Sequence, residues 1–213
     1  MNKFSQLSVI ALQNRGIIKS ADLYALKIEY RAIQRLIKDG VLEKIKYGIY
    51  RLKCESDKLS EIEQVAQLFP DGILCMYAAL FYYGYIDKKP TSWDIAFDKN
   101  VSKSRFVIDY PVVQPHYHNP RHLAYGVALA QFEHNSMFIF SRDRLICECL
   151  YFEKKIDYVT FNNALQRYRD DEKKNIAALI KYAVVRSVLK KVDKRFSSFL
   201  FDYCTTLPLE IEY

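Results

Sequence analysis

The sequence lacks the features that mark membrane-spanning and secreted proteins. No run of residues approaches the ~20 consecutive apolar positions that a transmembrane helix needs. Residues 1–12 carry neither a basic segment nor a cleavage site, so we expect no signal peptide. The five cysteines are odd in number and form no C-x-x-C pair, which argues against a disulfide framework and against a zinc knuckle. We therefore expect a cytoplasmic protein whose thiols are reduced.

Glycine is also scarce, with six residues, whereas tyrosine is abundant, with 17. This balance favours helices and packed aromatic side chains over a loop-rich fold. Hydrophobic residues make up 50% of the chain and charged residues 27%, which is typical of a globular protein rather than a disordered one. A chain of 213 residues is long enough for one small domain and one medium-sized domain.

The excess positive charge is confined to one end of the chain. The formal net charge is +7. Residues 1–53 hold eleven Lys or Arg against four Asp or Glu, while the rest of the chain holds 21 of each sign. Such confinement is expected where a short module meets a polyanion such as DNA and the remainder of the protein does not.

The basic segment predicts three helices followed by a hairpin. Apolar residues recur at helical spacing over 4–15, 20–26 and 30–39, and Ser20 stands where an N-cap would begin the second helix. Two short β-rich runs then flank Tyr47-Gly48, which is typical of a hairpin. A hairpin directly behind the third helix predicts the wing of a winged helix-turn-helix.

The third predicted helix has two different sides. On a wheel of about 100° per residue, Ala32, Ile33, Leu36 and Ile37 gather on one side, and basic and amide side chains gather on the other. Arg, Gln and Lys are the side chains that bind base edges and phosphates in the major groove. The predicted DNA-binding residues, including those of the wing, are Lys19, Ser20, Tyr30, Arg31, Gln34, Arg35, Lys38, Lys44, Lys46, Tyr47 and Arg51.

A charged helix face is often only a solvated surface, and helix-turn-helix shapes also serve in protein interaction. Three features together favour DNA binding: the order of the helices, the basic wing, and the confinement of the whole net charge to this segment.

The remaining residues predict a second, larger domain. We place the domains at 1–57 and 58–213, with a polar linker at Glu55–Lys58. Helices are predicted over about 59–69 and 73–83, and the second of these is apolar on all sides and therefore buried. Short strands are predicted at 93–97, 106–108 and 137–140, followed by helices over 144–201. The expected fold class is α+β: a winged helix-turn-helix, then a mixed domain with a small sheet packed on helices and a helical C-terminal region.

The second domain offers little that would support catalysis. Three histidines between His116 and His122 lie in a proline-bounded stretch that we expect to be a surface loop, without the patterns of a zinc site. Asp94, Asp98 and Asp109 alternate through the expected sheet, but the glycine-serine turn of a nucleotidyl-transfer site is missing. We expect no enzyme, no cofactor and no metal.

Three motifs in order resemble the AbiEi-type antitoxins of bacterial type IV toxin–antitoxin and phage abortive-infection systems. Leu42–Tyr50 is similar to the family's wing, Ala78-Ala79-Leu80 through Gly84 to a buried segment, and Ser141–Glu148 to its Ser-x-x-Arg-Thr-x-x-Asp motif. Ala, Leu and Glu stand at 78, 145 and 148, where Ser, Thr and Asp are common in the family. The resemblance runs along nearly the whole chain.

The resemblance implies an antitoxin that also represses its own operon by binding inverted repeats in promoter DNA. It further implies that residues 58–213 counteract a nucleotidyltransferase-type toxin, with which the antitoxin need not form a stable complex. Two other readings of the residues stay open. One is a plain transcriptional regulator whose second domain senses a small molecule or dimerises, and the other is an enzyme that the winged helix only targets to DNA.

Overall fold

The computed structural model describes residues 3–14, 16–53 and 60–206, with side chains for 5–14, 16–53 and 60–197. Contacts divide the chain into two units: unit 1 is Met1–Phe69 with Val101–Val113, and unit 2 is Pro70–Asn100 with Gln114–Tyr213. The predicted linker at Glu55–Lys58 falls outside the described residues, and the boundary between residues 57 and 58 stays a prediction.

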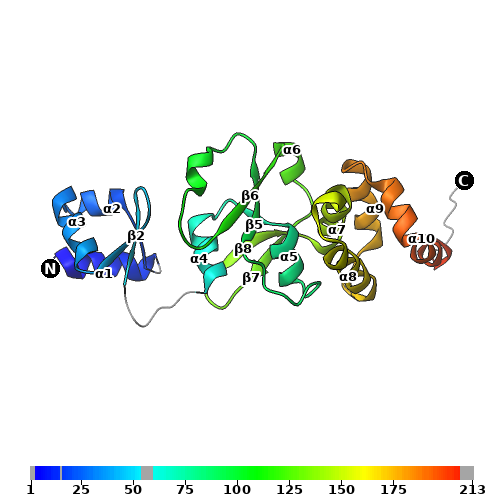
Figure 1. Ribbon diagram of the computed structural model, residues 1–213, viewed down its shortest axis with the longest axis horizontal. Coiled ribbons are helices and arrows are strands. Elements are labelled where there is room, and N and C mark those ends of the chain that lie inside the picture. Colours follow the sequence, from blue (N-terminus) through cyan, green and yellow to red (C-terminus); the bar gives the residue numbers. More distant parts are fainter. Residues whose placement is uncertain (1–2, 15, 54–59, 207–213) are drawn as a thin grey trace, which may run out of the picture. The chain divides into compact units, whose positions relative to one another are not determined.

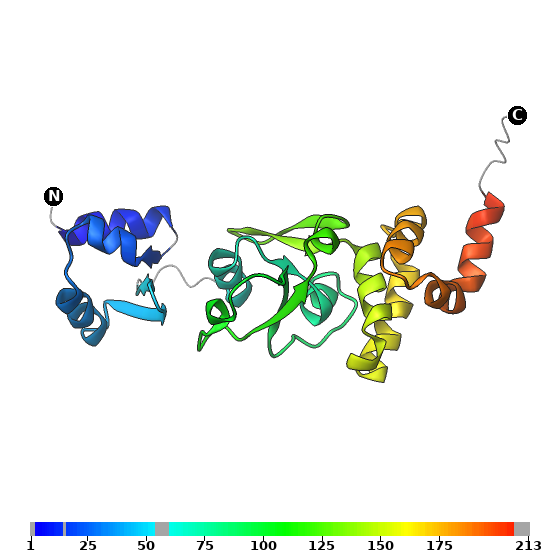
Figure 2. The ribbon, with the colours of Figure 1, turned by 90° about the horizontal axis from the view of Figure 1, so that it is seen from above.

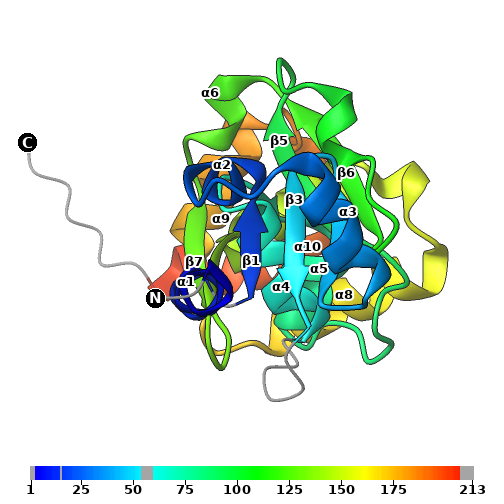
Figure 3. The same cartoon turned by 90° about the vertical axis from the view of Figure 1, so that its left-hand side faces the viewer.

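Unit 1 begins with three helices and a three-stranded antiparallel sheet of order β1-β3-β2. Figure 3 shows β1 and β3 lying side by side. The two strands β2 and β3 form the predicted hairpin. The elements are α1 (Lys3–Gln13), β1 (Ile17–Lys19), α2 (Ser20–Ala25), α3 (Tyr30–Lys38), β2 (Leu42–Lys46) and β3 (Ile49–Leu52).

One apolar core joins these elements. Every helix and strand of the module contributes a buried side chain to it, so the periodicity seen in the sequence corresponds to one shared interior. Its buried members are Leu7, Ala11, Ile18, Leu23, Ile28, Ile33, Leu42, Tyr50 and Leu52. Unit 1 also includes α4 (Glu61–Leu68) and the short 3-10 helix η1 (Lys103–Phe106).

Unit 2 contains a mixed five-stranded sheet of order β6-β5-β4-β8-β7, in which β4 runs parallel to β8 and antiparallel to β5. Helix α5 packs on the sheet at β5, and Figures 1 and 2 show the later helices gathered beyond the sheet. The elements are β4 (Ile73–Leu74), α5 (Met76–Tyr82), β5 (Trp93–Asp98), β6 (Val113–His118), α6 (Pro120–Leu123), β7 (Val127–Gln131), β8 (Ser136–Phe140), α7 (Arg142–Tyr151), η2 (Glu153–Lys155), α8 (Tyr158–Asp170), α9 (Ile176–Val185) and α10 (Leu189–Thr206).

The predicted fold class, α+β with a helical C-terminal region, is confirmed, but parts of the sheet differ from the prediction. Residues 73–83 were expected to form one buried helix and instead form β4 and α5, because an apolar run has no periodicity that separates the two. Residues 106–108 form no strand: Phe106 ends η1 and stacks on Phe69 with ring centroids 5.7 Å apart. Strands β6 and β7 were not predicted.

Strand β7 ends the sheet and leaves apolar side chains exposed. Val127 and Leu129 on β7 and Phe138 on β8 are 37%, 51% and 46% exposed. Leu129 lies opposite Phe138 in the antiparallel register, so these two side chains share one face. Among the described helices, none combines the length and the apolar content that crossing a bilayer requires.

A buried ion triad holds the helices of unit 2 together. Glu148 on α7 is 1% exposed and accepts two hydrogen bonds from Arg186, at 2.7 Å from Nε and 2.9 Å from Nη2. Arg144, one turn earlier on α7, is fully buried and pairs with the same carboxylate. Its guanidinium also lies 4.1 Å from the ring centroid of Tyr125 and 5.0 Å from that of Phe140. One carboxylate therefore neutralises two buried cations.

The approach of Arg144 to the preceding loop requires a glycine. Gly126 has a φ of +63°, and a Cβ at this position would lie 2.7 Å from Cβ of Arg144. Any larger residue would therefore force either the loop or Arg144 to shift.

Replacing Glu148 tests the importance of the triad. Glu148→Ala should lower the free energy of unfolding by about 3–5 kcal/mol, because it leaves two buried guanidinium groups without their carboxylate. The measurement is urea denaturation followed by the fluorescence of Trp93, the single tryptophan, which is buried in unit 2. The matched control is Asp87→Ala, which removes an exposed carboxylate from its pair with Arg167 and should leave the midpoint nearly unchanged. Equal midpoints for the two variants would contradict the assigned role of Glu148.

His118, on β6, is held uncharged by its surroundings. Burial lowers its pKa from 6.5 to about 4; nearby Glu148 opposes the shift, whereas the positive charges of Arg186 and Arg144 and the neighbouring His116 add to it. Its ring packs edge-on against Phe140 with centroids 5.8 Å apart. The sequence placed His116 and His118 in a surface loop, but both belong to a strand of the sheet.

This histidine predicts a specific pH dependence. Below pH 6.5 the unfolded chain takes up a proton at His118 that the folded protein refuses until about pH 4, so stability is present above pH 6.5 and lost as the pH falls. The loss is at most about 1.4 kcal/mol per pH unit. His118→Gln should flatten the decline between pH 6.5 and 5 in Trp93-monitored urea unfolding. The exposed control His134→Gln should keep the wild-type slope; a slope unaffected by His118→Gln would refute the assignment.

Candidate nucleic-acid interface

Helix α3 presents a basic face to solvent. Ile33 is fully buried in the core of unit 1, and Leu36 and Ile37 pack against that core, so the helix has a fixed rotation about its axis. Ala32, predicted on the apolar side, is exposed instead, because the buried stripe of so short a helix is narrower than the wheel suggests. The exposed side chains on the opposite side are Tyr30, Arg31, Gln34, Arg35 and Lys38.

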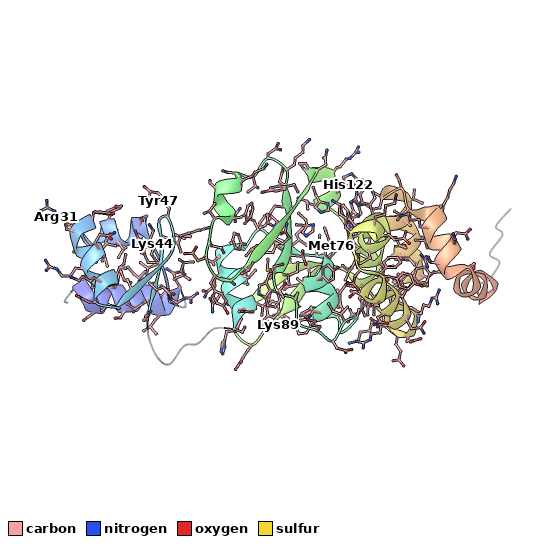
Figure 4. The ribbon with its side chains drawn as sticks, viewed as in Figure 1. Arg31, Lys44, Tyr47, Met76, Lys89 and His122 are labelled. Carbon is pink, nitrogen blue, oxygen red and sulfur yellow. The ribbon has the colours of Figure 1, made fainter. Side chains whose placement is uncertain are left out.

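The turn of the wing lies against the start of α2. The backbone N–H of Ser20 donates to the carbonyl oxygen of Gly48 at 2.8 Å, and Lys19 pairs with Ile49 across the sheet. Gly48 has a φ of +77°, which a two-residue turn of this kind requires. Tyr47, beside it, is 95% exposed. The fold therefore brings Lys19 and Ser20 close to the turn of the wing. Figure 4 labels Tyr47, which belongs to this turn.

Ser20 does not cap α2 as predicted. The N-cap is Lys19, and Ser20 is the first residue of the helix. Asp22, three residues beyond the cap, accepts a hydrogen bond from the backbone N–H of Lys19 at 2.8 Å. The carboxylate of Asp22 in the first turn thus satisfies the backbone N–H of the N-cap residue, Lys19.

The basic residues of the wing divide into two groups. Lys44 is exposed and lies in the middle of β2, and Figure 4 labels it and Tyr47. Lys46 instead donates from Nζ to the carbonyl oxygen of Arg105 at 3.3 Å and lies 5.0 Å from the ring centroid of Phe69. A register shift between Lys44 and Lys46 separates the two side chains.

Arg51 also makes contacts inside unit 1. Its Nη2 donates to Oε1 of Gln64 on α4 at 2.6 Å, and its Nη1 lies 3.8 Å from a carboxylate oxygen of Glu43 on the neighbouring strand. A phosphate would have to compete with both partners. The contact with Gln64 does not follow from local sequence, because Gln64 lies outside the segment that carries the wing pattern.

Two further side chains of the module were missed by the sequence analysis. Tyr24 on α2 is 56% exposed, and Lys27, in the turn between α2 and α3, is exposed with a φ of +54°. A non-glycine residue in this region is uncommon, so the turn is held by its surroundings. The sequence predicts a brief turn at Lys27-Ile28-Glu29 but gives no sign of this conformation.

The histidines and aspartates of unit 2 are only partly brought together. Nε2 of His116 on β6 lies 2.6 Å from Oδ1 of Asp94 on β5. Asp98 caps the backbone N–H of Asn100 after the same strand, while Asp109 belongs to unit 1. Across the described part of the chain, no three His, Cys, Asp or Glu side chains are grouped as a metal ion would need.

Three helices in this order, a two-stranded wing and an exposed basic third helix define a winged helix-turn-helix. Residues 6–53 match the model of a family described as "Transcriptional regulator, AbiEi antitoxin". The predicted resemblance is therefore confirmed over these residues, which are similar to a family of transcriptional regulators and antitoxins. The comparison with curated proteins gives no significant match.

A solved structure supports the fold over a longer stretch. The crystal structure of the RV2827C protein from Mycobacterium tuberculosis is similar with a TM-score of 0.68 and 14% sequence identity. The similarity covers 92% of this chain and 76% of that chain. At this identity the likeness concerns the fold, and it extends beyond the residues that the family model matches.

The salt dependence of DNA binding should separate the two groups of wing residues. Each phosphate contact contributes about 0.9 to the slope of log K against log salt concentration. Lys44→Ala should reduce the magnitude of that slope by about 0.9, the contribution of one phosphate contact. Arg51→Ala should reduce it less, because the guanidinium of Arg51 already pairs with Gln64 and Glu43.

The measurement is fluorescence anisotropy with a duplex from the protein's own promoter at several salt concentrations. Lys53→Ala is the matched control, since it removes one exposed positive charge of the same segment outside the predicted site. Equal reductions for Lys44→Ala and Lys53→Ala would show that the wing acts only through the total charge.

Proposed function

We propose that the protein is the antitoxin of a type IV toxin–antitoxin system and that it also represses its own operon by binding inverted repeats in the promoter. The observation that carries the proposal is the exposed basic face of α3 in a segment that matches the AbiEi antitoxin family. In this proposal Arg31, Gln34 and Arg35 read base edges, and Lys38 and Lys44 hold the backbone. The protein would act in the bacterial cytoplasm, in defence against phage.

The charge distribution supports a division of labour within the chain. All of the net positive charge lies in residues 1–53, so the electrostatic attraction to DNA belongs to the winged helix. The rest of the chain is neutral overall, as expected of a surface with another role. We propose that it counteracts a nucleotidyltransferase-type toxin without catalysing a reaction. Binding to inverted repeats would use two copies of the chain, one for each half-site.

A plain transcriptional regulator remains the second candidate. The observation that favours it is a pair of clefts in unit 2, lined by polar and aromatic side chains, of the size that small ligands occupy. A regulator with a sensing domain would need such a site. It would not need to protect a cell from the product of the adjacent gene.

A separation-of-function variant tests the leading proposal. Arg35→Ala should lower operator affinity by about 1–3 kcal/mol and relax base preference, because it removes a base-reading side chain from an exposed position that the core does not use. The variant should still rescue cells that express the adjacent gene product. The measurements are a promoter–reporter assay for repression and survival on co-expression for neutralisation.

Lys53→Ala, with the same change in charge, should keep both activities. If Arg35→Ala represses as strongly as the wild type, α3 is not the recognition helix. If the adjacent gene product is not toxic, or the wild-type protein fails to rescue, the antitoxin proposal fails and the plain regulator is favoured.

A further inference from the structure

Strand β7 pairs with β8 along one side only, at the end of the sheet (Figure 1). In an antiparallel pair, the backbone groups of alternate residues point toward the neighbouring strand, and those of the residues between them point away from it. Beyond the two ends of β7, the carbonyl oxygen of Gly126 accepts from Ser141, and the N–H of Phe132 donates to Asn135, both at 2.8 Å. The even-numbered residues therefore face β8, and the backbone groups of residues 127, 129 and 131 point outward.

A tyrosine occupies one end of this outward edge. The N–H of Gln131 donates to the hydroxyl oxygen of Tyr82 at 3.1 Å, as the alternation requires. The ring of Tyr82 also packs edge-on against that of Phe132, with centroids 5.7 Å apart. Among the described residues, the outward N–H and C=O groups of Val127 and Leu129 have no hydrogen-bond partner. A further strand can therefore pair with β7 at these two residues.

The two outer strands of the sheet differ in how they resist such pairing. Strand β6, at the other end, contains Pro115, which has no N–H to donate to a ladder. Strand β7 contains neither a proline nor a charged residue. The side chains of Val127 and Leu129 are exposed on one face, beside Phe138 of β8. Strand β7 is thus the outer strand to which another strand can be added.

Strand β7 is complementary to a second copy of itself in antiparallel orientation. A two-fold axis brings the same segment of two copies together. With the axis at Ala128, Val127 of each copy lies opposite Leu129 of the other, and each of these two pairs exchanges two hydrogen bonds. All four bonds use the outward groups that otherwise have no partner. An axis at Leu129 would instead pair Val127 with Gln131, whose N–H is already bonded to Tyr82.

The side chains also fit the register with the axis at Ala128. Leu129 lies opposite Phe138 within the chain, and Val127 of the second copy would lie on its other side. One row of apolar side chains would then continue from one copy into the next. On the other face the two Ala128 side chains meet, and their small size permits the close approach of a pair that is not hydrogen-bonded. No like charges are brought together, because β7 carries none.

We propose that β7 joins two copies of this chain into one continuous sheet, with a two-fold axis at Ala128. The occupant is a second copy because β7 supplies matching donors, acceptors and apolar side chains to itself in this register. The contact is short, so the dimer forms reversibly, with a Kd of about 1–100 μM. Two copies related by a two-fold axis are also what an inverted repeat requires, but the dimer does not depend on the proposed DNA or toxin partners.

Sedimentation velocity of the full chain, from about 1 to about 200 μM, tests the proposal. The sedimentation coefficient should rise from that of a monomer to that of a dimer. Leu129→Pro removes an outward N–H and no hydrogen bond to β8, so it should raise the Kd at least about tenfold. A monomer at every concentration would overturn the proposal, as would an unchanged Kd for a folded Leu129→Pro variant. Circular dichroism checks folding.

Two double variants test the register without a proline. Val127→Lys/Leu129→Lys places like charges opposite each other across the axis and should abolish the dimer. Its matched counterpart, Val127→Glu/Leu129→Lys, places opposite charges there and should dimerise at least about tenfold more tightly than the first variant. Equal dimerisation of the two double variants would overturn the proposal, even if Leu129→Pro does not fold.

Amide hydrogen exchange of the wild-type chain, followed by NMR, locates the contact. The amides of Val127 and Leu129 should become protected as the protein concentration rises. The amides of Ala128 and Ala130, which face β8, should be protected at every concentration and serve as the internal control. A dimer in which exchange at Val127 and Leu129 does not slow would use another surface and would overturn the proposal.

Discussion

The architecture of unit 2 depends on one buried carboxylate. Glu148 lies between the guanidinium groups of Arg144 and Arg186, and it is the anion that makes both cations tolerable in an interior. Through it α7 is fixed to the end of α9, and Arg144 in turn is enclosed by Tyr125 and Phe140. A charge cluster of this kind is sensitive to geometry, since its benefit is lost if any member moves away. It therefore fixes one packing of the helices where apolar contacts alone would permit several.

Unit 1 is organised on the opposite principle. The core that joins its three helices and the wing is apolar, and the basic side chains of α3 lie on the surface, where water and mobile ions surround them. The core sets the rotation of α3 through Ile33, so the outward direction of the basic face results from packing rather than from charge. The same chain thus uses charge in two ways. In unit 2 ion pairs specify internal structure, and in unit 1 unneutralised charge remains available to an external polyanion.

Sequence periodicity predicted the winged helix well because its signals are local. Each helix of the module carries its own apolar spacing, and the hairpin has its turn residues within the motif. The sheet of unit 2 was predicted less well. Strand β6 contains two histidines, a glutamine and a proline, a composition that is more typical of a loop than of a strand. Strand β4 and helix α5 lie in one apolar run, in which the sequence does not show where the strand ends and the helix begins. The partners of Lys46 and Arg51, and the meeting of Asp94 with His116, arise from tertiary contacts that no spacing encodes.

Strand β7 is the last strand of the described sheet, and this position affects how the protein behaves at high concentration. Val127–Gln131 contains no charged residue and no proline. Such residues normally prevent an edge strand from pairing with a strand of another molecule. The exposed side chains of Val127 and Leu129, together with Phe138, form an apolar surface beside the backbone groups of this strand. Self-association through this strand is therefore expected at high protein concentration. A single lysine in place of Leu129 would be the simplest protection against self-association.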